Sequence, residues 1–199
     1  FQFATSILLI IGTIVVYNQL NFIQTTKLGF NKDQVLIING VDALNKNQQP
    51  FKNEVLNMKG VKTGTLSSYL PVSNSSRSDF TFSKEAVLSA ESGIDMQTWA
   101  VDYDYINTMG MELVKGRNFS KDYADSSSII ITETTAKMLG WEDPIGKQLY
   151  GAGQNPGDPV RSATIIGVIK DFHYESLHQK LGPLNLRLGD FASLASFKI

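Results

Sequence analysis

The 199-residue sequence contains no cysteine. This absence excludes disulfide-bonded scaffolds, zinc sites with cysteine ligands, iron–sulfur clusters and thiol catalysis. It leaves the cellular compartment open, because a domain of this size needs no disulfides either in the cytoplasm or outside it. A basic excess is also missing, since 18 Lys and Arg stand against 19 Asp and Glu. Nucleic acid is therefore not an expected partner, because its binders usually carry a positive surplus.

Charge is absent from one end of the chain as well. Residues 1–26 contain no charged side chain, and Lys27 is the first. Within this stretch, residues 3–17 form an apolar run whose centre is apolar on every helical face, as in helices buried in protein or lipid. Such a run spans about 22 Å, which is less than the roughly 30 Å of bilayer hydrocarbon. Because the chain starts at Phe1 without methionine, we expect a transmembrane helix that is clipped at its start.

Two other interpretations of this segment stay open. A buried core helix is compatible with its length. A secretory signal would carry a basic leading region and a small-residue cleavage site, and neither is visible. Lys27 and Lys32 are too few to orient a membrane helix. The residues after the apolar run are of the kinds found at a membrane–water interface, namely Tyr17, Asn18, Gln19, Asn21 and Phe22.

The remaining chain has the pattern of an ordinary globular domain. Strands are predicted over residues 33–39, 61–69, 80–82, 96–101, 128–131, 161–170, 184–188 and 195–199, and short helices over 50–58, 104–109 and 133–139. Thr132 is expected to cap the last of these helices, and Gly60, Gly110 and Gly140 are expected to follow the helix ends. Polar loops are predicted over 71–78 and 151–159. The pattern favours an α+β fold, with a mixed or antiparallel sheet and short helices on one face.

One short segment combines histidine with carboxylates: Asp171, His173, Glu175 and His178. Imidazole and carboxylate are both ligands for divalent metals. However, their spacing matches no established metal motif, so a polar strand end with hydrogen-bonded histidines is the preferred interpretation. We predict no metal site here, and a metal-dependent hydrolase built on His173 and His178 stays an alternative.

Two glycine-rich segments are superficially similar to nucleotide-binding loops. Residues 140–148 differ from a P-loop because five residues separate the glycines, Pro144 removes an N–H donor and Gln148 stands where Ser or Thr is needed. Residues 151–157 miss the dinucleotide-binding spacing by one residue. Both segments are predicted to be turns.

The other polar and aromatic groups also predict structure rather than chemistry. We interpret two carboxylate pairs, Asp102 with Asp104 and Glu142 with Asp143, as helix caps and solvated charge. Four aromatic residues are expected in the core or at an interface: Trp99, Tyr103, Tyr105 and Trp141. The sequence therefore predicts no catalytic residue, no cofactor-binding residue and no cofactor, and we do not expect an enzyme.

Four segments, taken together, resemble a known family: residues 116–119 (Gly-Arg-Asn-Phe), 130–136, 139–147 and 165–178. They are similar to the extracytoplasmic core domain of MacB/FtsX-type ABC transporter permeases. The apolar N-terminal run, followed by residues 19–23 and 28–30, is similar to the membrane helix that precedes that domain. The resemblance extends from Phe1 to about Leu188. The sequence departs from the family at Thr132, where Asn is frequent, although Thr is also a good helix cap.

The resemblance implies a permease subunit whose periplasmic α+β domain transmits motion across the bacterial inner membrane. It divides the chain into a membrane helix over residues 1–26 and a core domain over 27–199, which is expected to be incomplete at its C-terminal end. The implied partners are an ABC ATPase, a second permease subunit and a periplasmic adaptor or lipoprotein. In this interpretation the shared glycines serve turns or close packing, at Gly116, Gly140, Gly146 and Gly167. The alternative from another class is a ligand-binding sensor domain of a membrane receptor.

Overall fold

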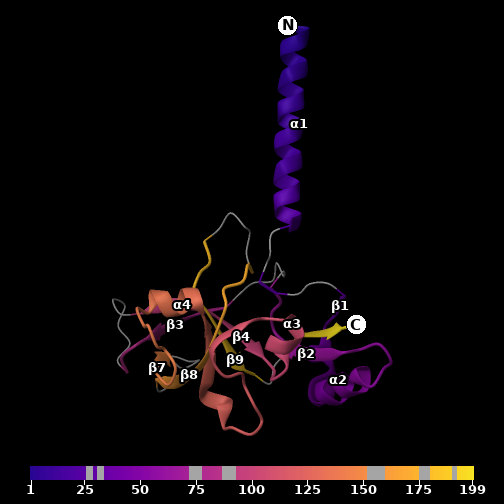
Figure 1. Ribbon diagram of the computed structural model, residues 1–199. Helices are drawn as coiled ribbons and strands as arrows, with labels where there is room; N and C mark the ends of the chain where they lie inside the picture. The colour runs from indigo at the N-terminus through magenta and orange to yellow at the C-terminus, as the bar shows by residue number, and fades with distance from the viewer. Residues whose placement is uncertain are drawn as a thin grey trace.

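A long N-terminal helix stands apart from the rest of the protein in the computed structural model (Figure 1). The structure describes residues 1–25, 29–30, 34–71, 78–86, 93–151, 160–174, 180–189 and 192–199. The helix α1 (Gln2–Thr25) has 24 residues and is therefore about 36 Å long. Its residues Gln2–Asn21 are long and apolar enough to cross a membrane, and none of that stretch is buried. The core-helix interpretation of this segment thus finds no support.

The domain that follows contains ten strands and three short α-helices in the described residues. The strands are β1 (Val35–Asn39), β2 (Thr63–Ser67), β3 (Asp79–Ser83), β4 (Ile94–Val101), β5 (Leu113–Gly116), β6 (Ser128–Thr132), β7 (Gln148–Gly151), β8 (Arg161–Ile169), β9 (Leu184–Leu188) and β10 (Leu194–Lys198). The helices are α2 (Gln48–Leu56), α3 (Tyr105–Met109) and α4 (Glu133–Met138), with 3₁₀ turns η1 (Val41–Asn47) and η2 (Asp125–Ser127). The predicted α+β class is confirmed.

All eight predicted strands and all three predicted helices are present, but two strands, β5 and β7, were not predicted. Gly110 and Gly140 follow α3 and α4 with φ of +64° and +66°, as expected. Gly60 lies four residues beyond the end of α2, so its predicted role at that helix end is wrong. Gly151 of the predicted loop over 151–159 belongs to β7. The rest of that loop, most of the loop over 71–78, and Lys27 and Lys32 lie outside the described residues.

Six of the strands close into a ring. Their order is β4-β3-β7-β8-β6-β9, and β9 closes the circle because it pairs with β6 on one side and with β4 on the other. The pairs β4–β9 and β6–β8 are parallel, and the other pairs in the ring are antiparallel. The short strand β5 attaches to the side of β8. The sheet is therefore mixed, as predicted.

Alternate residues of these strands fill the ring with apolar side chains. The buried members of this core are Met96, Ile129, Ile131, Leu139, Leu149, Ile165 and Val168. Leu139 follows α4, and Ala136 and Trp141 pack against the same core, so α4 closes one end of the ring. The strand ends Thr132, Ile169 and Leu184 lie at this end. Ser128, Arg161 and Arg187 therefore lie toward the opposite end of their strands.

A three-stranded arm extends from the ring. The strands β1, β10 and β2 pair antiparallel, with β10 in the middle, and α2 packs against them over Val55, Leu66 and Phe197. The arm joins the ring's sheet through one residue pair, Ser67 with Val101. The strand β1 is an edge strand, and its Leu36 and Ile37 are 47% and 38% exposed.

Two glycines allow the backbones of β5 and β8 to approach each other. Gly116 ends β5 with φ of +74°, and a Cβ there would collide with the carbonyl oxygen of Ile166. At Gly167 in β8, a Cβ would lie 2.5 Å from the carbonyl oxygen of Arg117. Both positions lie in the segments that resemble the permease family. Their predicted role in turns and close packing is confirmed by this geometry.

Candidate functional site

Five aromatic side chains meet between the six-stranded ring, the three-stranded arm and residues 29–30, which follow α1 in the sequence. We call this cluster, Phe30, Tyr69, Trp99, Phe172 and Tyr174, the aromatic junction. Trp99 is at its centre and is fully buried; its ring centroid lies 5.6 Å from that of Phe172 and 5.5 Å from that of Tyr174. Tyr69 stacks on Trp99 at 6.0 Å. The edge-to-face and stacked contacts favour one fixed arrangement of these rings.

Residues 29–30, which follow α1 in the sequence, lie directly on this junction. Phe30 meets Phe172 edge-to-face with centroids 6.4 Å apart. The backbone at Gly29 is equally close, since a Cβ there would lie 2.7 Å from Phe172 Cβ and 2.8 Å from the Asp171 carbonyl oxygen. Only glycine fits this position, which also has φ of +86°. The segment after β8 rises on the same side of the domain as α1 (Figure 1).

The carboxylate of Asp171 connects the aromatic junction to α4, which closes the ring of strands. Asp171 Oδ1 accepts a hydrogen bond from the backbone N–H of Thr134, and Oδ2 accepts one from its hydroxyl, both at 2.8 Å. These bonds lie in the first turn of α4, where a negative charge is favoured by the unpaired N–H groups. Thr132 also caps this helix, accepting from Thr135 N at 3.3 Å, as predicted.

A buried lysine connects the arm to the start of α3. Lys52, on α2, is 2% exposed, and its Nζ donates to Asp102 Oδ2 and Asp104 Oδ2 at 2.6 Å each. Asp102 also accepts from Leu66 N at 2.9 Å and from the Thr65 hydroxyl. The prediction of solvated charge is therefore wrong for Asp102, because α2 and β2 cover it. It holds for Glu142 and Asp143, which are exposed.

The predicted aromatic core positions are confirmed, and the turn at 140–148 is not arranged for phosphate. Trp99 and Tyr105 are fully buried, while Tyr103 and Trp141 are partly buried against the cores. The N–H of Gly146 donates to the carbonyl of Ile165 at 2.8 Å, so this donor serves the fold. Lys147 Nζ lies over the Trp141 ring, 4.9 Å from its centroid.

The histidine–carboxylate segment is only partly described. Asp171 binds α4, as shown above, and His173 is half-buried. Glu175 and His178 lie outside the described residues. Within the described part of the chain, no three His, Asp or Glu side chains gather in a way that would hold a metal ion. The hydrolase alternative therefore gains no support from these residues.

One ion pair was missed by the sequence reasoning. Arg117 binds Asp125 with both guanidinium nitrogens, each at 2.7 Å, and its guanidinium carbon lies 4.0 Å from the Tyr123 ring centroid. Asp125 is 3% exposed and also accepts from Ser120 N and the Ser128 hydroxyl. The hydrogen bonds from Arg117 lower the pKa of Asp125 from 3.8 to about 2, against the effect of burial. The available signal was Arg117 itself, within residues 116–119.

The described residues thus form an apolar helix followed by an α+β domain with a closed mixed sheet. The sequence matches the MacB-like periplasmic core domain family over residues 3–188, and the chain belongs to this family. Comparison with curated protein sequences gives no significant match.

Two solved structures are similar in fold. The periplasmic region of MacB from Actinobacillus actinomycetemcomitans matches with a TM-score of 0.56 and 14% identity, over 86% of this chain and 76% of that one. The extracellular domain of YknZ, a noncanonic ABC-type transporter from Gram-positive bacteria, matches with a TM-score of 0.52 and 15% identity, over 82% and 81%. The family match confirms the expected family, and the two structures confirm the expected fold. At these identities the structures establish the shared fold.

Proposed function

We propose that this chain is the extracytoplasmic part of an ABC transporter permease, and that it transmits ATPase-driven motion to a substrate that is exported or extracted. The contact of Gly29 and Phe30 with Phe172 carries this proposal. It places the exit of α1 on the junction where the ring and the arm meet. A displacement that reaches Phe30 would thus be received by packed aromatic side chains.

Two polar connections extend this path into both parts of the domain. Asp171 passes a displacement of Phe172 to α4, which closes the ring. The buried pair of Lys52 and Asp102 holds α2 of the arm against the start of α3. Asp171, Lys52 and Asp102 thus each bind a neighbouring element of the fold. This supports a mechanical domain with no catalysis and no cofactor of its own.

We further propose that α1 crosses the bacterial inner membrane and that residues 27–199 lie in the periplasm. A helix of about 36 Å is long enough for hydrocarbon about 30 Å thick, with a modest tilt. The apolar side chains of α1 are not buried by the rest of the described chain, so we expect lipid or another membrane helix to cover them. The proposed partners are an ABC ATPase, a second permease subunit and a periplasmic adaptor or lipoprotein.

Affinity purification of the full-length membrane protein from its native membrane tests this function. We expect an ABC ATPase to copurify in a fixed ratio and to hydrolyse ATP in the complex. Copurification of a kinase or another signalling protein, with no ATPase, would refute the permease proposal in favour of a sensor. A tagged, unrelated inner-membrane protein is the control for detergent carry-over.

The coupling path is tested in the same complex by Phe172→Leu, with Phe51→Leu as the matched control. Phe51 forms a similar edge-to-face pair with Phe197, at 6.2 Å, but within the arm. We expect Phe172→Leu to leave ATPase copurification intact and to lower substrate movement per ATP hydrolysed. Equal effects of the two variants would contradict a special role for the aromatic junction.

A further inference from the structure

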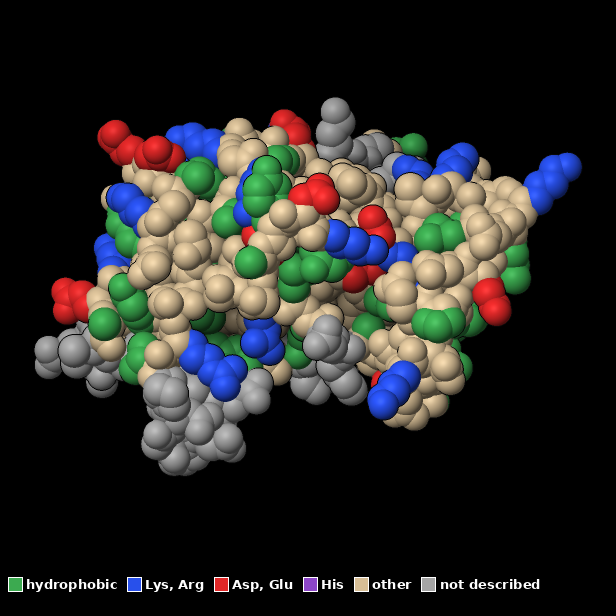
Figure 2. Space-filling view, turned by 90° about the horizontal axis from the view of Figure 1, so that it is seen from below, with side chains coloured by type: hydrophobic (Ala, Val, Ile, Leu, Met, Phe, Trp, Pro, Cys, Tyr) green, Lys and Arg blue, Asp and Glu red, His purple; other side chains and the backbone are tan. Residues whose placement is uncertain are grey.

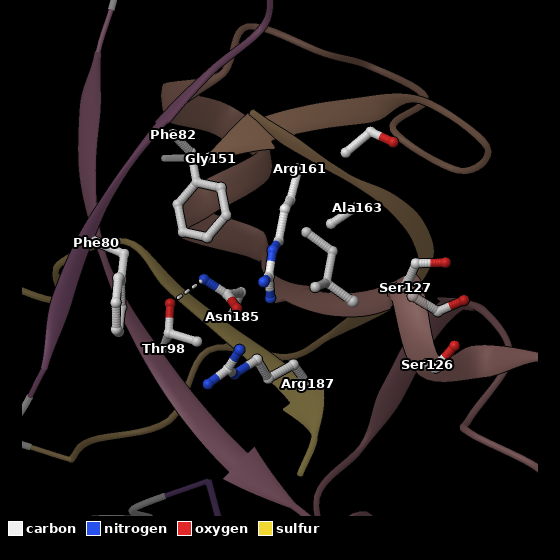
Figure 3. Close-up of a pocket in the computed structure, with 13 residues that line it drawn as sticks. Phe80, Phe82, Thr98, Ser126, Ser127, Gly151, Arg161, Ala163, Asn185 and Arg187 are labelled. Carbon is white, nitrogen blue, oxygen red and sulfur yellow. Dashed lines mark hydrogen bonds between the residues drawn. The ribbon is translucent and has the colours of Figure 1, made fainter. Parts of the chain in front are cut away.

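The ring of strands is open at the end opposite α4 and contains a cavity there. Its volume is about 390 Å³, and its lining comes from β3, β4, β6, β7, β8, β9 and the turn η2. This size lies within the range of small-molecule pockets, roughly 300–1,000 Å³. Every strand of the ring contributes to the lining, so the cavity is the unfilled end of the ring's interior (Figure 3).

One wall of the cavity is apolar. Phe80 and Phe82 project into it from alternate positions of β3, and Ala163 faces it from β8 (Figure 3). Phe80 is 37% exposed, although it is a large apolar side chain on a strand. Such a wall favours an aromatic or aliphatic body in the cavity.

Two arginines supply positive charge. Arg161 begins β8 and Arg187 lies on β9, and both reach toward Asn185 in the middle of the cavity (Figure 3). Among the described residues, neither guanidinium forms a salt bridge or a hydrogen bond. The buried carboxylate of η2, Asp125, is already bound by Arg117. Two unpaired guanidinium groups beside an apolar wall suit a carboxylate, which arginine binds through paired N–H donors.

The floor of the cavity has an unused hydrogen-bond acceptor. Asn185 is fully buried, and its Nδ2 donates to the Gln97 carbonyl at 3.2 Å and to the Thr98 hydroxyl at 2.9 Å. Because a carbonyl oxygen only accepts, this bond fixes which end of the amide is nitrogen. The Oδ1 atom then has no partner among the described residues. A buried acceptor without a partner costs about 1–3 kcal/mol, and a ligand donor would relieve it by displacing a side chain that covers it.

We propose that this cavity binds a small amphipathic carboxylate that also carries an N–H donor, such as an N-acylated amino acid. The carboxylate lies between Arg161 and Arg187, the apolar body packs on Phe80 and Phe82, and the N–H donates to Asn185 Oδ1. The cavity thus offers one complementary group for each part of this ligand.

The position of the cavity indicates where this ligand comes from. The η2 turn, which forms one lip, lies on the side of the domain away from α1 (Figure 1). Figure 2 shows the same distal face, on which Lys and Arg side chains lie among hydrophobic and acidic ones. The ligand therefore enters from the aqueous phase rather than from a bilayer that surrounds α1.

Titration calorimetry with N-benzoylglycine tests the proposal, using the full chain in lipid nanodiscs and empty nanodiscs as the blank. This probe has a phenyl body, an amide N–H and one carboxylate. We expect saturable binding, with at least about tenfold weaker binding of the neutral amide N-benzoylglycinamide, because it lacks the charge that arginine recognises. Equal binding of the two compounds, or no binding of either, overturns the proposal.

Substitutions at the cavity test the location. We expect Arg161→Gln combined with Arg187→Gln to weaken N-benzoylglycine binding at least about tenfold, whereas Lys59→Gln, an exposed charge beyond α2, leaves it unchanged. Ala163→Phe, which fills the cavity, should abolish binding. The arginine variant decides the question because both side chains are exposed and neither supports the core. Unchanged binding in that variant overturns the proposal.

Discussion

The acid sensitivity of the Arg117–Asp125 pair can be calculated from the structure. The pKa of Asp125 is about 2 in the folded chain, against an ordinary value of 3.8. A carboxyl group with a lowered pKa stabilises the fold above its unfolded pKa and loses that effect as the pH falls through the folded pKa. The difference corresponds to about 2 kcal/mol of unfolding free energy at neutral pH, since one pKa unit equals roughly 1.4 kcal/mol. About half of it is lost by pH 3.

The substitution Asp125→Asn removes this contribution. We expect the variant to be about 2 kcal/mol less stable than the parent at pH 7, and the difference to shrink toward zero as the pH falls from 4 to 2. Urea unfolding followed by the fluorescence of Trp99 and Trp141 measures this difference. The matched control is Asp122→Asn, because the carboxylate of the exposed Asp122 accepts from Ser120 alone among the described residues. A difference that stays constant from pH 7 to pH 2 would refute the reasoning.

Substitutions probe three further contacts, each measured by urea unfolding at pH 7. Lys52→Met keeps the side-chain length but leaves the covered Asp102 without its buried cation, so we expect a loss of about 3 kcal/mol; a loss below 1 kcal/mol would mean that water reaches the carboxylate. Gly116→Ala should cost about 3 kcal/mol through its positive φ and the collision with β8, whereas Gly140→Ala, with open space around it, should cost about 1 kcal/mol. Thr132→Ala should cost about 1 kcal/mol by removing the cap of α4, and no loss would show that the cap is replaced by water.

Local patterns predicted most of the secondary structure. Runs such as residues 128–131 and 165–169 are apolar because both faces of these strands are covered, and the glycines after α3 and α4 mark helix ends by their positive φ. The strand β5 carries no such signal, since its four residues are all exposed. It is held instead by pairing with β8, which a single stretch of sequence does not reveal.

The candidate site depends on contacts between distant segments, and these were harder to predict. The closure of the ring by β4 and β9 joins Gln97 to Leu184, and no local pattern encodes that partnership. The burial of Lys52 was equally hidden, because lysine on a short polar helix is normally solvated. The family resemblance indicated that residues 165–178 belong to a shared segment. It did not show that Asp171 in this segment binds the start of α4.

The position of β10 has a consequence for the synthesis of the protein. The strands β1 and β2 are never neighbours in the sheet, since β10 separates them, although they are the first two strands to be made. Neither strand can pair with β10 until residues 194–198 have been translated. By then α1 has long since emerged from the ribosome. Pairing between such distant segments is slow and leaves strand edges exposed in the meantime. We therefore expect the arm to be the last part to fold, and nascent chains that stop before β10 to be targets for chaperones and proteases.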